Sequence, residues 1–207
     1  NNPRSRSPVS CVSEIEEVIK KIPTKLIFIG DDTFGLNSKW RNEFLVEYKR
    51  KINIGFMCLL RVEVVSEEFV KALKEAGCCY IQFGIESGND YVRRDIMNRK
   101  MSNKQIVKAF DIVRRYGIRT NAINIIGVPG ETEDMIWDTI KLNRRIKPSS
   151  SGVNIFYPYK GTKLGDACFE KGLVDEELYY SFSKERRDTV LNYPEEFKER
   201  LVYYHQN

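Results

Sequence analysis

The chain has 207 residues, 42% of them apolar, so it is long enough to form one globular domain around a sizeable core. No apolar run approaches the ~20 residues that span a bilayer, and the net charge of +5 comes from basic residues spread along the chain instead of grouped with aromatics. These totals argue against a membrane span and against nucleic acid as the main partner. The five cysteines lack disulfide-framework or zinc-ribbon spacing, which indicates a reducing compartment, and we expect a cytoplasmic protein.

The chain opens with a helix, since Ser7 and Pro8 have the residue types of an N-cap and a first helical position and apolar residues then recur at helical spacing. Apolar, β-rich runs and amphipathic segments alternate from there to residue 171. We expect helices at residues 8–22, 38–51, 67–76, 103–116, 132–146 and 163–171, and strands at residues 25–30, 52–60, 79–85, 119–127 and 152–157.

This alternation predicts an α/β fold with a parallel sheet, because right-handed crossovers place the carboxyl end of every strand on the same side. Five such units make most of a (βα) barrel. After residue 172 the sequence is rich in Glu, Lys, Tyr and Pro and contains no further βα unit. We therefore expect a partial barrel over residues 1–172 and an appended helical or partly disordered tail over residues 173–207.

Acidic residues follow the glycine that ends each of three apolar runs. Asp31 and Asp32 come after the first predicted strand, Glu86 after the third predicted strand and Glu131 after the fourth. The active sites of barrels and doubly wound sheets are built from the loops at the carboxyl ends of the strands. We expect these carboxylates to share one such rim, where they could hold a divalent metal, accept from an ammonium group or cap their own turns.

The loop after the third predicted strand contains Glu86, Ser87 and Gly88. A carboxylate and a hydroxyl suit the hydroxyl groups of a sugar, and the glycine allows the backbone to approach a ligand closely. A structural turn would explain the glycine equally well.

The loop after the fourth predicted strand contains Gly127, Pro129 and Gly130. These residues force a tight bend, which we expect to bare main-chain N–H and C=O groups that can grip a flat purine.

Two arginines are candidates for binding an anion. Arg99 precedes the helix that follows the third strand, where its guanidinium could hold a carboxylate in bidentate fashion, although a solvated surface role fits the local sequence as well. Arg61 ends the second strand and could bind an anion or simply pair with Glu63. We include both arginines among the candidate ligand-binding residues.

In their order and spacing, five segments of the chain resemble the body of a radical S-adenosylmethionine (SAM) enzyme, most of all the group that often carries an N-terminal cobalamin-binding domain. The resemblance runs from about residue 4 to about residue 172. The segments are FIGDDTF, LLRVE, FGIESGNDYVRRDIMNRK, INIIGVPGET and FYPYKGTKL.

The resemblance implies a partial (βα) barrel of the radical-SAM type that holds SAM against a four-iron four-sulfur cluster. Reductive cleavage of SAM would give a 5′-deoxyadenosyl radical that functionalises a C–H bond of an unidentified small molecule, with an electron donor for the cluster and with cobalamin use left open. By position, Gly30 to Asp32 would meet the methionine ammonium and Arg99 the methionine carboxylate. Glu86 and Ser87 would meet the ribose, and Gly127 to Glu131 the adenine.

The chain departs from this family at the cysteines. The family's cluster is held by a CxxxCxxC triplet after the first strand. Here Cys78 and Cys79 are adjacent and the other cysteines lie far apart. Because RSRSPVSCVSEIEEVIKKI resembles the helix after the cluster loop, we expect the first strand and that loop to precede Asn1. The chain would then be a core fragment that performs no radical chemistry by itself.

Two other classes of function fit the same residues. One is a metal-dependent barrel lyase or hydrolase that would place Asp31, Asp32, Glu86 and Glu131 around magnesium and Arg99 on a phosphate. The other is a non-catalytic nucleotide-binding module.

Overall fold

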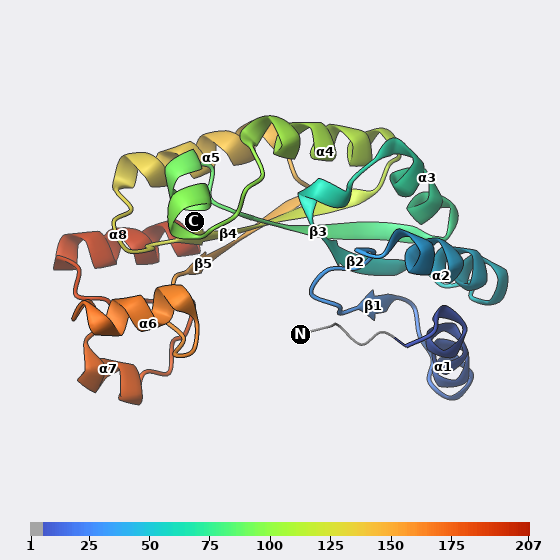
Figure 1. Cartoon of the computed structure of the whole chain (residues 1–207), viewed down its shortest axis with the longest axis horizontal. Coiled ribbons are helices and arrows are strands. Elements are labelled where there is room, and N and C mark those ends of the chain that lie inside the picture. The colour runs from blue at the N-terminus through green and yellow to red at the C-terminus, as the bar shows by residue number, and fades with distance from the viewer. Residues whose placement is uncertain (1–5) are drawn as a thin grey trace. The chain divides into compact units, whose positions relative to one another are not determined.

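A computed structural model describes residues 6–207. The strands are β1 (Ile27–Ile29), β2 (Phe56–Leu60), β3 (Cys78–Glu86), β4 (Arg119–Ile126) and β5 (Ser150–Ile155). The α-helices (Figure 1) are α1 (Pro8–Lys21), α2 (Ser38–Lys51), α3 (Glu67–Glu75), α4 (Asn103–Arg115), α5 (Glu133–Ile146), α6 (Lys163–Glu170), α7 (Glu176–Ser181) and α8 (Glu195–Gln206). A 3-10 helix, η1 (Val62–Val64), and a π-helix, η2 (Val92–Ile96), complete the described elements.

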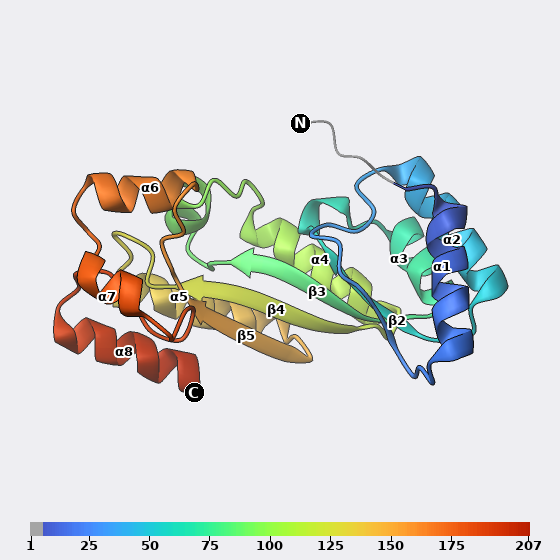
Figure 2. The ribbon, with the colours of Figure 1, turned by 90° about the horizontal axis from the view of Figure 1, so that it is seen from below.

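The five strands form one sheet in the order of the chain, β1-β2-β3-β4-β5, of which β2 to β5 are labelled in Figure 2. The pairs of β1 with β2 and of β2 with β3 are parallel, with Ile27 opposite Phe56 in the first pair. Strands in this order, joined by helices, are what the βα alternation predicts. The predicted α/β fold of the partial-barrel type is therefore confirmed.

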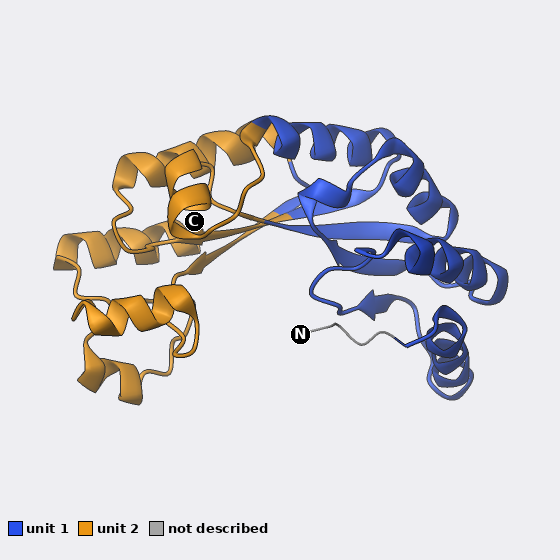
Figure 3. Ribbon diagram, viewed as in Figure 1, with its two compact units in different colours: residues 1–84, 104–121, 148–150 blue, residues 85–103, 122–147, 151–207 orange. Residues whose placement is uncertain are grey.

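The chain divides into two compact units (Figure 3), which we describe one at a time. Unit 1 comprises residues 1–84, 104–121 and 148–150, and unit 2 comprises residues 85–103, 122–147 and 151–207. Among residues 6–207, no helix has both the length and the apolar content needed to cross a membrane.

Unit 1 contains an aromatic cluster where α2 packs on β2. Phe34 and Phe44 meet edge to face with ring centroids 5.4 Å apart, and Tyr48 meets Phe56 in the same way at 4.8 Å. All four side chains are buried, and edge-to-face contacts between such rings add to the free energy gained by burying them. The helix begins where predicted because Asn37 caps it, accepting a hydrogen bond from the backbone N–H of Trp40.

Unit 2 is built around β4, β5 and the helices that follow them. Leu201 of α8 is fully buried in a cluster with Ile126, Ile136 and Ile155. Val174 pairs with Leu191 in an isolated antiparallel bridge next to α6 and α7. Residues 173–207, which we expected to form an appended tail, thus contribute two helices and buried side chains to this unit.

Candidate functional site

The backbone at the end of β3 has an unusual conformation. Glu86, the last residue of this strand, has a φ of 67°, a left-handed value that glycine adopts easily and other residues rarely do. Asn98, which directly precedes Arg99, is also left-handed, with a φ of 52°. Backbone strain of this kind persists only where the surrounding structure holds it, and it is found disproportionately at functional sites.

Glu86 and Arg99 form an ion pair, with 3.1 Å between the carboxylate Oε1 and the guanidinium Nη2. The Glu86 side chain is 16% exposed and that of Arg99 33% exposed, so the pair is half-buried and open to solvent on one side. Burial raises the pKa of Glu86, and the charge of Arg99 partly opposes that rise. Within the described residues, the buried Nε of Arg99 has no hydrogen-bond partner. The pair therefore combines a partly exposed carboxylate with a partly exposed guanidinium, one nitrogen of which is buried and unpartnered.

Ser87 is turned away from this pair. Its side chain is fully buried, and its hydroxyl lies 3.2 Å from the hydroxyl of Thr139 on α5 and accepts from the backbone N–H of Asn89. The predicted ribose contact of Ser87 stays a prediction, and this hydroxyl has its partners inside the protein. We leave Ser87 out of the proposed ligand contacts for that reason.

Gly88 is needed for packing against a helix. A Cβ at this position would lie 2.4 Å from the backbone oxygen of Asp138 and 2.6 Å from Cα of Thr139. The expectation that Gly88 lets the backbone approach a ligand is therefore wrong, because the chain that it approaches is α5. The close contact fixes the loop that carries Glu86 to this helix.

The loop after β4 forms a tight turn as predicted. Gly127 and Gly130 have φ values of 75° and 82°, and the N–H of Glu131 donates to the carbonyl of Val128 over 3.0 Å. A Cβ on Gly130 would meet nothing within 4 Å, so that side of the turn is open.

Glu131 satisfies the backbone of its own loop. Its Oε2 accepts from the N–H of Gly127 over 2.6 Å and from the N–H of Val128 over 3.4 Å. The residue is only 5% exposed, and burial raises the pKa of its carboxyl to about 7 although both N–H groups oppose the rise. Its Oε1 is buried and has no partner among the described residues. The expectation that Glu131 belongs to an open acidic rim is not supported by this geometry.

Tyr193 closes the same loop from the other side. Its hydroxyl lies 3.2 Å from the carbonyl oxygen of Gly127 and 2.9 Å from that of Val128, and donates to them. Burial raises the pKa of this phenol well above its usual range. The main-chain groups of Gly127 and Val128 are thus satisfied within the protein, and the expectation that the turn bares them is wrong at these two residues. Pro129 and Gly130 remain the exposed face of the turn.

The other predicted site residues belong to unit 1. Gly30, Asp31 and Asp32 are exposed after β1. Arg61, at the end of β2, pairs with Glu63 over 2.7 Å, and the two side chains are 41% and 31% exposed. The alternative that Arg61 pairs with Glu63 is therefore the one that the structure adopts.

The residues described fit SAM better than they fit a metal. Glu86 offers an acceptor to hydroxyl groups and Arg99 a cation to a carboxylate. From residue 6 to residue 207, by contrast, no three His, Cys, Asp or Glu side chains are grouped to hold a metal ion, and all five cysteines are free thiols. A four-iron cluster does not fit the described residues, and the predicted magnesium site is not supported either.

Sequence reasoning missed two residues that hold the candidate site together. Arg93 is fully buried although it is an arginine, and Tyr193 lies in a segment that we expected to be appended. The charged residues next to Arg93 in the sequence are typical of a solvated surface, and the short helix η2 has no apolar period that could have indicated burial.

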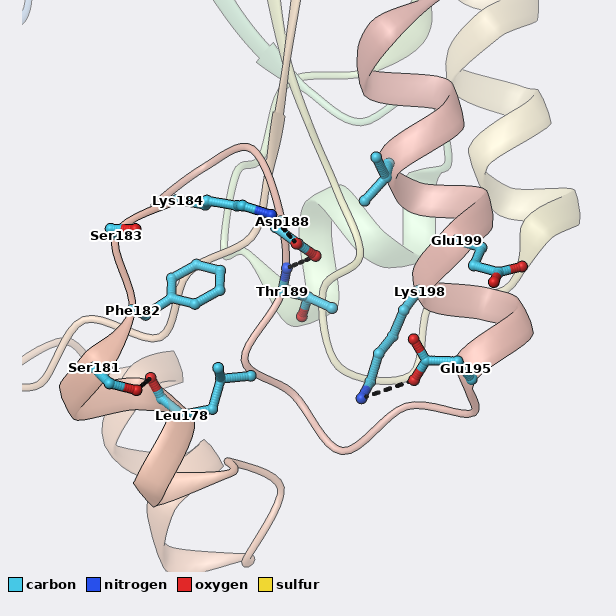
Figure 4. A pocket seen from close by; sticks show the side chains of 11 residues that line it. Leu178, Ser181, Phe182, Ser183, Lys184, Asp188, Thr189, Glu195, Lys198 and Glu199 are labelled. Carbon is cyan, nitrogen blue, oxygen red and sulfur yellow. Dashed lines mark hydrogen bonds and ion pairs between the residues drawn. The ribbon is translucent and has the colours of Figure 1, made fainter.

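A separate cavity of about 550 Å³ lies among α7, the segment 182–189 and α8. Figure 4 shows two ion pairs among its lining residues, Lys198 with Glu195 and Lys184 with Asp188. None of the predicted site residues lines this cavity. The chemistry of the candidate site therefore belongs to the strand ends.

Comparison with known proteins gives a consistent result. A family model described as the Radical SAM superfamily matches residues 1–142. An uncharacterised methyltransferase of Pyrococcus horikoshii is 27% identical over 172 residues, which cover 83% of this chain and 37% of that protein. The anaerobic magnesium-protoporphyrin IX monomethyl ester cyclase of Rubrivivax gelatinosus is 24% identical over 182 residues, 86% of this chain and 33% of that enzyme.

A solved structure supports the fold. The radical SAM methyltransferase TsrM from Kitasatospora setae, determined with cobalamin and a [4Fe-4S] cluster bound, superposes with a TM-score of 0.69 at 19% identity, over 81% of this chain and 34% of that one. The chain thus spans about a third of the length of the curated relatives and of the solved structure that it matches.

Proposed function

This chain belongs to the radical SAM superfamily, and from that premise we propose that the half-open pair of Glu86 and Arg99 binds the S-adenosyl ligand. The premise rests on the family model, which matches residues 1–142 of the 207. The proposal rests on the ion pair, in which the Arg99 and Glu86 side chains both remain partly exposed to solvent. In this superfamily bound SAM supplies a 5′-deoxyadenosyl radical that abstracts hydrogen from a substrate.

Each residue has a defined task in this proposal. Arg99 holds the methionine carboxylate, because a planar guanidinium can donate two parallel hydrogen bonds to it. Glu86 accepts from the ribose hydroxyls, and the turn at Pro129 and Gly130 lies against the adenine. Gly30, Asp31 and Asp32 belong to unit 1, so their contact with the methionine ammonium stays a prediction from the sequence.

For the protein that contains this chain, we propose functionalisation of a C–H bond in a small molecule, methylation included. Two relatives carry the names of a methyltransferase and a cyclase, and the superposed structure is a methyltransferase with cobalamin bound. Cobalamin, the cluster and an electron donor belong to this proposal and not to the residues described. A cytoplasmic location is proposed on the same basis.

The test is binding of S-adenosylhomocysteine to the full 207-residue chain, measured by calorimetry. Removing the guanidinium in Arg99→Ala should weaken binding by ~1.5–3 kcal/mol, which is typical of a hydrogen-bonded charged group. Glu86→Gln should weaken binding less, because the amide oxygen still accepts. Arg115→Ala, which removes an exposed ion pair with Glu67, serves as the matched control and should leave affinity unchanged.

A second ligand separates carboxylate binding from general damage to the site. 5′-Methylthioadenosine lacks the amino-acid portion, so Arg99→Ala should bind it as well as the unmodified chain does. If Arg99→Ala binds S-adenosylhomocysteine with undiminished affinity, Arg99 does not hold the carboxylate and the proposal loses its main support.

A further inference from the structure

Arg93 is the most completely buried charged residue among those described, with no exposed surface. Its Nε donates to the carbonyl of Met101 over 2.8 Å, and its Nη1 donates to the carbonyl of Ser87 over 2.6 Å and to Oδ1 of Asn103 over 2.8 Å. Its Nη2 donates to the carboxylate of Asp90, which forms the ion pair. All three nitrogens of one guanidinium are therefore engaged by backbone or short polar side chains.

These acceptors connect the two segments that carry the candidate ligand pair. Ser87 directly follows Glu86, and Met101 lies two residues after Arg99. The backbone makes the same link, because the N–H of Arg99 donates to the carbonyl of Arg93 over 2.8 Å. One residue thus holds both the carboxylate side and the guanidinium side of the pair.

Asn103 extends the connection. Its Nδ2 donates to the carbonyl of Gly88 over 2.9 Å while its Oδ1 accepts from Arg93. Gly88 in turn donates to the hydroxyl of Thr139 over 2.8 Å. The loop after β3 is therefore fixed both to the start of α4 and to α5, all within unit 2.

The shape of the guanidinium matters here as well as its charge. An arginine carries five N–H donors in a fixed planar fork, whereas a lysine carries three on one nitrogen. A lysine at position 93 could keep the charge beside Asp90 but could not reach Met101 and Ser87 together. A buried charge with fewer partners is costly, so the segment would shift to solvate it.

We propose that Arg93 is a positioning residue that sets the orientation of Arg99 toward Glu86. Its role in ligand binding rests on the proposed function, but its effect on the geometry of the pair does not. Arg93 has no exposed surface, so any effect on a ligand passes through the placement of Arg99.

The first measurement needs no ligand. The side-chain Nε–Hε signal of Arg99 is recorded by NMR on the full chain, unmodified and with Arg93→Lys. We expect the Arg99 signal to shift or broaden in Arg93→Lys and to stay in place in Arg115→Lys, the surface control. An unchanged Arg99 signal in a folded Arg93→Lys chain would overturn the proposal. If Arg93→Lys does not fold, Asp90→Asn gives the same test with a smaller perturbation, because the Asp90 side chain is 59% exposed.

The second measurement is a double-mutant cycle on S-adenosylhomocysteine affinity. We expect Arg93→Lys to weaken binding about tenfold, Arg99→Ala about thirtyfold and the double variant about thirtyfold, because coupled residues are not additive. Losses that multiply to about three hundredfold would show that Arg93 acts independently of Arg99. A chain that binds no S-adenosylhomocysteine, but whose Arg99 signal responds to Arg93→Lys, would overturn the proposed function and leave the positioning role supported.

Discussion

Glu86 ends β3 and Glu131 lies in the loop after β4; both residues belong to unit 2, and their surroundings differ in one decisive respect. Glu86 faces a guanidinium and remains partly exposed, whereas Glu131 is 5% exposed and accepts from two N–H groups of its own loop. A carboxylate that is buried, and whose Oε2 is used by its own backbone, is poorly placed to meet a ligand from solvent. The comparison shows that two glutamates in similar positions at strand ends can have different surroundings, and only those of Glu86 leave the carboxylate partly exposed.

The two loops can be compared directly through their glycines. Gly88→Ala should destabilise the chain by about 3 kcal/mol, because the new methyl group would overlap the backbone of α5. Gly130→Ala should cost only about 1 kcal/mol, since its site is open and the penalty is that of the left-handed backbone alone. Urea unfolding of both variants measures the difference. Equal losses would mean that the contact of Gly88 with α5 is not rigid.

The buried carboxyl of Glu131 makes stability depend on pH. Its folded pKa of about 7 lies above the ordinary value of 4.5, so between these values the folded state binds more protons than the unfolded state. The contribution of this carboxyl to the free energy of unfolding should therefore be fully present below pH 4.5 and be lost as the pH rises through 7.

Glu131→Gln should remove this dependence, because the amide cannot ionise and its oxygen can still accept from the loop. At pH 8 the variant should be more stable than the unmodified chain by ~2 kcal/mol, a figure that reflects the cost of keeping this carboxylate charged when buried. Urea unfolding from pH 5 to pH 8 gives the measurement. Glu195→Gln, at a side chain that is 77% exposed, should leave the pH profile as it is.

Tyr193 tests how far the loop after β4 depends on the C-terminal segment. Tyr193→Phe removes the donor to two carbonyls and should cost about 1 kcal/mol of unfolding free energy. Tyr203→Phe is the matched control, since Tyr203 is 58% exposed, and it should change stability very little. The melting temperatures of both variants are measured by calorimetry. Equal melting temperatures would contradict the role of the Tyr193 hydroxyl in holding the loop after β4.

Arg61 provides the smallest expected effect. Its pair with Glu63 is largely exposed, and exposed pairs of this kind contribute little. Arg61→Ala should therefore change the unfolding free energy by less than about 0.5 kcal/mol. A larger loss of unfolding free energy, measured with urea, would show that Arg61 contributes to stability in the way expected of a buried, hydrogen-bonded arginine such as Arg93.

Much of the fold could be predicted because local signals agree with one another. Asn37 and Ser66 cap α2 and α3, each accepting a hydrogen bond from the backbone N–H three residues later. α2 has the predicted bounds of 38–51. The ends of the strands were predicted less accurately. β5 begins at Ser150, before the predicted Gly152, and β1 covers only Ile27–Ile29. Strand ends are set by pairing with neighbours, which the sequence of one strand does not contain.

The candidate site was harder to predict because the same residue types serve different purposes. Nothing in the amino-acid sequence distinguishes the surroundings of Glu86 from those of Glu131. Nor does the sequence show that the hydroxyl of Ser87 faces Thr139. The π-helix that buries Arg93 follows no simple period, so a charged residue inside it looks like a surface residue. Such roles depend on contacts between segments that are distant in sequence.

The last helix has a consequence for how this protein can be shortened or varied. Leu201 is fully buried, and its Cδ1 would lie only 2.8 Å from a Cβ on Gly127. Deleting α8 would uncover the apolar side chains beneath it and remove the neighbour that packs against the turn at Gly127. Proteolytic trimming before residue 195 should therefore lower the solubility of the chain, and a homologue with a bulkier residue at position 127 should carry a smaller one at position 201.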